Sequence, residues 1–80
     1  MTPRKPRMTE GEVIERARRV AEAEGWPWEE PVSAKARKKG LFSKSYYWDI
    51  ISNWSGLGRN VIIYIDDDTG EVTGKGYQPR

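Results

Sequence analysis

The sequence predicts an α+β fold: one N-terminal helix packed on a three- to four-stranded antiparallel meander sheet. The first observation is a capping box at Thr9 and Glu12 that opens an amphipathic stretch. The second is a series of later runs rich in β-branched and aromatic residues, with turn-forming residues between them. The third is that the connections between these runs are short, which makes sequential strands neighbours in the sheet.

The helix is predicted over residues 9–24. Thr9 and Glu12 satisfy unpaired amides of the first turn, and Met8 and Val13 are spaced to form a hydrophobic staple. Gly25 supplies the left-handed residue that ends the helix. The apolar stripe of this helix consists of Val13, Ala17, Val20 and Ala21.

Four strands are predicted after the helix, over residues 32–38, 45–52, 60–66 and 71–77. The first alternates small apolar with basic residues, as an edge strand does, and its lysines discourage pairing with other chains. The third is the most β-prone run of the chain. Together with the helix stripe, the predicted core contains Trp48, Ile50, Val61, Ile63, Ile65 and Val72.

The length of 80 residues corresponds to one small domain, which we place at residues 8–78, after a flexible basic tail at 1–7. The chain has no cysteine and no histidine, so thiolate nucleophiles, disulfides and the commonest metal ligands are missing. We expect no enzyme, no cofactor and no metal. No run has the length and apolarity of a membrane span, so we expect a cytoplasmic protein without a membrane partner.

Three consecutive acids, Asp66, Asp67 and Asp68, precede Thr69 and Gly70 between the last two predicted strands. Such residues form hairpin turns, because Asp and Thr side chains accept backbone amides and Gly tolerates positive φ. A calcium loop and a catalytic carboxylate are the alternatives. An EF-hand loop needs Gly and Glu at its sixth and twelfth positions, and the chain does not have them there. We expect a hairpin tip in which all three carboxylates are hydrated.

The most informative functional pattern is a second apolar face on the predicted sheet. One helix covers about 10 Å of width, so it shields only one face. If Trp48 pairs with Ile63, the opposite face carries Tyr47, Ile51, Ile62 and Tyr64, and such a patch on a monomer usually has a use. Trp54 either fills the small core or anchors a partner, and Arg59 in the same Gly-rich loop is a candidate contact.

A basic segment offers a different function. Lysine and arginine side chains near aromatic residues could follow a phosphate backbone while the rings stack on bases. The net charge of +2 is small for such a role, and an edge strand protected by lysines explains the same residues. The candidate nucleic-acid contacts are Lys35, Arg37, Lys38, Lys39 and Lys44.

Residues 45–73, with W-D-I-I, a loop and then V-I-I-Y-I-D-D-D-T-G-E-V, resemble the ending of small PepSY-type domains. The helix followed by hairpins is also similar to bacterial immunity-type proteins with cystatin-like or NTF2-like sheets. These resemblances imply a regulatory or inhibitory binding module and no catalytic residue.

From these patterns we expect a small non-enzymatic protein-binding module, of the inhibitory or immunity type, or a homodimer through the second sheet face. The alternative is a nucleic-acid-binding module that uses the segment from Lys35 to Lys44.

Overall fold

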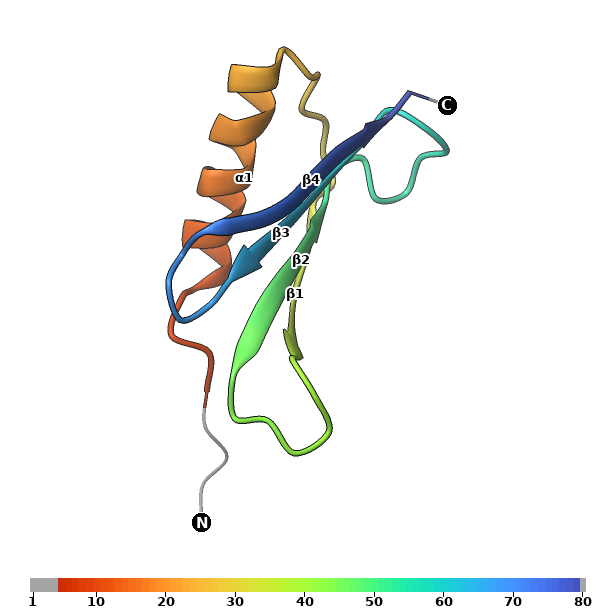
Figure 1. Ribbon diagram of the computed structural model, residues 1–80. Coiled ribbons are helices and arrows are strands. Elements are labelled where there is room, and N and C mark those ends of the chain that lie inside the picture. The colour runs from red at the N-terminus through yellow and green to blue at the C-terminus, as the bar shows by residue number, and fades with distance from the viewer. Residues whose placement is uncertain (1–4, 80) are drawn as a thin grey trace.

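The α+β prediction is confirmed by a computed structural model, which describes residues 5–79. The sheet is antiparallel throughout, with the strands in the order β1-β2-β3-β4. Helix α1 lies against one face of this sheet, and β1 and β4 form its two edges (Figure 1). The elements are α1 (Glu10–Glu24), β1 (Ser33–Lys38), β2 (Tyr46–Ile51), β3 (Asn60–Asp66) and β4 (Val72–Gln78).

Both ends of α1 are capped as the sequence predicts. The Glu12 amide donates to Thr9 Oγ1 at 3.2 Å, and the Thr9 amide donates to Glu12 Oε1 at 2.9 Å. Gly25 ends the helix with φ 77°, a left-handed conformation that costs Gly little. Trp26 then stacks on Tyr77 of β4, with ring centroids 6.0 Å apart, and so fixes the connector to the sheet.

The core lies between α1 and the inner face of the sheet, which we define as the face that α1 covers. The register differs by two residues from the pairing of Trp48 with Ile63 that was assumed above: Trp48 lies opposite Ile65, and Ile63 lies opposite Ile50. A shift of two residues keeps every side chain on its face, because strand side chains alternate with period two. The buried apolar residues are Val13, Ala17, Ala21, Trp48, Ile50, Val61, Ile63 and Ile65.

Two residues that were predicted to lie in the core are not fully buried. Val20 is only partly buried and packs on the margin of the core. Val72 is 39% exposed, so its prediction as a core residue is wrong. It lies where the β3–β4 pairing is irregular, between Tyr64 and Ile65, and the backbone of α1 approaches β1, β2 and β3 but not β4. The helix therefore does not cover Val72.

The loop between β2 and β3 is held by hydrogen bonds. The Asn53 amide donates to the Glu29 carbonyl at 2.7 Å, and the Trp54 amide donates to the Pro31 carbonyl at 2.9 Å. Ser52 is fully buried, and its hydroxyl oxygen accepts the Val61 amide at 2.9 Å. This Gly-rich loop joins β2 and β3 as a hairpin.

Candidate functional site

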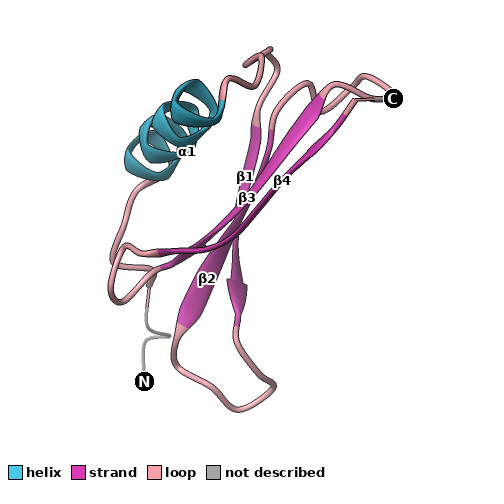
Figure 2. Cartoon of the chain, turned by 45° about the horizontal axis from the view of Figure 1, so that its top comes forward, coloured by secondary structure: helices cyan, strands magenta, loops and turns pink. Residues whose placement is uncertain are grey.

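The outer face of the sheet is the face opposite α1. Figure 2 shows the helix on one side of the sheet and no other element of residues 5–79 on the opposite side. The strand register determines which residues share this face, because they lie opposite one another in neighbouring strands. They are Ser33, Lys35 and Arg37 of β1; Tyr47, Asp49 and Ile51 of β2; Ile62, Tyr64 and Asp66 of β3; and Gly74, Gly76 and Gln78 of β4.

The four apolar side chains predicted for this face do lie together on it. Tyr47 and Tyr64 meet edge to face, with ring centroids 6.1 Å apart, and Ile51 lies directly opposite Ile62. Tyr64 also extends over β4: a Cβ atom added at Gly74 would lie 3.0 Å from its Cδ2 atom. Tyr64 is 40% exposed, and the other three are half-buried.

Charged pairs that the sequence analysis missed interrupt this apolar surface. Arg37 Nε lies 3.2 Å from Asp49 Oδ2, and Lys39 Nζ lies 2.6 Å from Asp66 Oδ2. The hydrogen bond from Lys39 lowers the pKa of the Asp66 carboxyl. Asp49 Oδ1 is buried and accepts no hydrogen bond within the described residues. The period-two alternation of β1 and β2 was the signal that could have placed Arg37 and Asp49 on one face.

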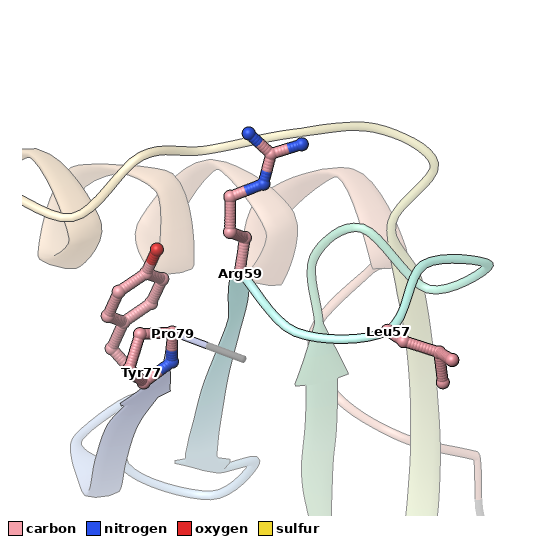
Figure 3. A pocket seen from close by; sticks show the side chains of 4 residues that line it. All are labelled: Leu57, Arg59, Tyr77 and Pro79. Carbon is pink, nitrogen blue, oxygen red and sulfur yellow. The ribbon is translucent and has the colours of Figure 1, made fainter.

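Trp54 and Arg59, the two candidate partner contacts in the β2–β3 loop, lie beside different parts of the domain. Trp54 is 54% exposed, and the Lys35 ammonium lies 5.9 Å from its ring centroid, so this indole adjoins the β1 side of the outer face. Arg59 has its guanidinium near the connector before β1, with Nε 3.4 Å from Glu29 Oε2 (Figure 3). It lines an open hollow of about 520 Å³, together with Leu57, Tyr77 and Pro79.

The five basic residues of the alternative site do not form one patch. Lys35 and Arg37 lie on the outer face, whereas Lys38 follows the opposite alternation of β1. Lys39 and Lys44 belong to the β1–β2 loop. Arg37 and Lys39 are also paired with carboxylates, which reduces the positive charge that they offer to phosphate.

The aspartates form the predicted turn but are not equivalent. Asp66 Oδ1 accepts the amides of Asp68 and Thr69, as a turn-forming Asp does. Asp67 is 3% exposed, so the expectation that all three carboxylates are hydrated is wrong. Its Oδ1 accepts Trp48 Nε1 at 2.9 Å and the Met8 amide at 2.8 Å, and its Oδ2 accepts the Arg7 amide at 2.6 Å.

Asp67 therefore joins three distant segments of the chain. Arg7 also pairs with Asp68, Nε to Oδ1 at 3.0 Å, so this residue of the predicted tail contacts the folded domain. Residues 1–4 of that tail lie outside the described residues. For the rest of the segment, the flexible tail stays a prediction.

The bonds to Asp67 predict a pH dependence of stability. Burial raises the pKa of the Asp67 carboxyl, but hydrogen bonds from Arg7, Met8 and Trp48 lower it, and the net pKa lies below its ordinary value of 3.8. A depressed pKa stabilises the fold above the unfolded-state pKa, and this contribution is lost as pH falls through the folded-state pKa. We expect Tm to fall below about pH 4, and Asp67→Asn to flatten that part of the profile. Equal slopes in thermal melts of the two proteins would contradict this.

Large apolar side chains are also exposed at two loop tips. Leu41 and Phe42 in the β1–β2 loop are 85% and 93% exposed, and Leu57 in the β2–β3 loop is fully exposed. Their only sequence signal is the presence of large apolar residues inside turn-forming stretches.

Comparison with protein-family models, curated proteins and solved structures finds no match to this chain. Among residues 5–79, no three Asp or Glu side chains are grouped so that they could hold a metal ion. Within the same range, no helix has the length and apolarity needed to cross a membrane.

Proposed function

We propose that this chain is a small protein-binding module that uses the outer face of the sheet. The observation that carries the proposal is the contiguous set of Tyr47, Ile51, Ile62 and Tyr64 on a face that no described element covers. Aromatic residues with an apolar body and a polar end are enriched in the buried centres of protein interfaces. An inhibitory or immunity-type role without catalysis agrees with the resemblance from sequence, and the cytoplasm is the location expected from the lack of a membrane span in the sequence.

The charged pairs on the same face support selectivity. Asp49 lies opposite Lys35 of β1 and Tyr64 of β3, and its Oδ2 pairs with Arg37. A partner whose charges complement these pairs gains affinity over one whose charges repel them.

The area of the outer face is smaller than the area that a stable protein interface buries on each partner. Four strands about 4.8 Å apart and six residues long give a projected area of about 400 Å². A stable interface buries about 800 Å² on each partner. A partner on the outer face must therefore contact adjoining residues as well, and Trp54 beside Lys35 is the exposed aromatic residue in that position. In the other form of the proposal, the partner on the outer face is a second copy of this chain, which gives a homodimer.

Nucleic acid is the second candidate function. Lys35 and Arg37 share the outer face with Tyr47 and Tyr64, an arrangement that favours stacking on bases beside a phosphate backbone. The pairing of Arg37 with Asp49 and of Lys39 with Asp66 works against it. Salt separates the two functions, because phosphate contacts weaken steeply with added salt and apolar contacts do not.

The test is the double variant Ile62→Thr with Tyr64→Lys. We expect it to keep the helix and sheet, measured by circular dichroism, and to lose self-association in sedimentation and partner capture from host lysate. The matched control is Leu41→Thr with Leu57→Lys, which introduces the same two polar residues at exposed loop positions and should retain both self-association and partner capture. If the outer-face variant is folded and every association survives, the binding surface lies elsewhere.

A further inference from the structure

The edge of the sheet at β4 is open on its helix side. The backbone of α1 approaches β1, β2 and β3 but not β4, and Figure 1 shows β4 at the edge nearest the viewer, beside the helix. A hollow of about 260 Å³ lies between them. It is lined by Val20 of α1 and by Val72, Thr73, Gly74 and Lys75 of β4.

Polar contacts close the two ends of this hollow. At one end Lys75 Nζ pairs with Glu24 Oε2 at 2.8 Å, and at the other Arg16 Nη1 donates to the Gly70 carbonyl at 2.8 Å. Val20 and the 39% exposed Val72 supply the apolar side chains of the hollow, which Thr73 and Gly74 also line.

The free edge of β4 carries unpaired backbone groups. The Ser52 amide donates to the Val61 carbonyl, so the polar groups of Val61 face β2. Those of Ile62 and Tyr64 then face β4 by alternation, where they meet Gly76 and Gly74. The N–H and C=O groups of Lys75 and Tyr77 must therefore point away from β3, to a side on which the described residues place no strand.

The two sheet edges differ in how they are protected. The β1 edge carries Lys35, Arg37 and Lys38, and lysines on an edge discourage strand addition. On β4, Lys75 is directed to Glu24 and Tyr77 is stacked on Trp26, both on the helix side. The outer side of β4 has glycines, and a Cβ atom at Gly76 would meet nothing within 4 Å. An added strand thus has free access to β4.

We propose that an extended peptide segment of a partner protein adds to the β4 edge and places one apolar side chain in the hollow beside Val20. Strand addition of this kind takes affinity from the backbone hydrogen bonds and specificity from pockets for alternate side chains. Here the free N–H and C=O groups of Lys75 and Tyr77 supply the backbone hydrogen bonds, and the hollow supplies the pocket for a side chain.

Charge specifies a second position of the peptide. The Arg16 guanidinium donates to a carbonyl, and within the described residues it forms no ion pair with a carboxylate. Arg16 and Val20 are four helix residues apart, about 6 Å along the axis. Two strand residues span about 6.7 Å, and residues at that spacing share a face. An acidic side chain two positions from the apolar one therefore reaches Arg16.

The test uses a labelled threonine-rich peptide of about nine residues that carries one leucine and, two positions away, one aspartate. We expect saturable binding in fluorescence anisotropy, with amide chemical-shift changes at β4 and Val20. A control peptide with the aspartate next to the leucine presents the two side chains on opposite faces, and should bind more weakly.

Two matched variants of the protein test the edge itself. Lys75→Pro removes an outward-facing N–H, which an edge strand tolerates, and should weaken binding about tenfold or more. Ala36→Pro makes the equivalent change on the β1 edge and should leave affinity within about twofold. Lys75→Ala measures the loss of the ammonium group alone, and Val20→Lys, which fills the hollow, should also weaken binding.

Other results would overturn the proposal. These are an absence of saturable binding up to about 2 mM peptide, equal affinity of both peptides, or shift changes confined to β1 or the outer face. The outer-face variant Ile62→Thr with Tyr64→Lys should bind the peptide normally. Failure of the β4 site is thereby distinguished from failure of the outer-face function.

Discussion

Asp67→Ala should destabilise the domain by about 3 kcal/mol or more, measured as the free energy of unfolding in urea. The carboxylate accepts the Trp48 indole N–H and the backbone amides of Arg7 and Met8, and its residue is 3% exposed. Alanine would leave the Trp48 donor buried without an acceptor, and buried donors without partners are costly. It would also release the segment before α1 from the sheet.

The neighbouring acid provides the matched control. Asp68→Ala removes a surface ion pair with Arg7, whose side chain is 58% exposed, and should change stability by about 0.5 kcal/mol or less. Similar losses in the two variants would show that Asp67 is an ordinary turn residue and that its contacts contribute little.

Ile63→Ala should cost about 2–5 kcal/mol, the range for deleting a large buried aliphatic side chain and leaving a cavity. Ile63 is fully buried and lies opposite Ile50 of β2 and Lys75 of β4, on the face that α1 covers. A small domain has only about 5–15 kcal/mol of stability, so this single change approaches the limit for folding.

Ile62→Ala is the comparison, because it deletes the same atoms one residue earlier on the outer face. Ile62 is half-buried, and water or neighbouring side chains can occupy the space it leaves. We expect a loss of about 1 kcal/mol, and equal losses at both positions would contradict the assignment of the two faces.

The strongest local signals in the sequence predicted the elements correctly. The capping box at Thr9, the left-handed Gly25 and the β-branched run at residues 60–66 each depend on neighbours within a few positions. The outer-face set of Tyr47, Ile51, Ile62 and Tyr64 was also predictable, because strand alternation survives a register error of two residues.

The three aspartates could not be distinguished from one another by their neighbours in the sequence. Asp66, Asp67 and Asp68 have identical side chains and similar neighbours in sequence, yet only Asp67 is enclosed. Its partners Arg7 and Trp48 are 60 and 19 residues away, and nothing near Asp67 in the chain specifies them. The same is true of Asp49 with Arg37 and of Asp66 with Lys39, which convert a basic segment into a partly neutralised surface.

Short-range backbone preferences and period-two alternation were enough to predict the capped helix, the strands, the hairpin at the aspartates and the two faces of the sheet. The exposure of Val72, the burial of Asp67 and the open β4 edge beside α1 depend instead on how the elements pack together. A helix covers a limited width of sheet, so α1 leaves Val72 and the β4 edge uncovered, whereas Asp67 is enclosed by Arg7, Met8 and Trp48. Which strand the helix leaves uncovered depends on how the whole core packs, and that is a property of contacts between residues far apart in the chain.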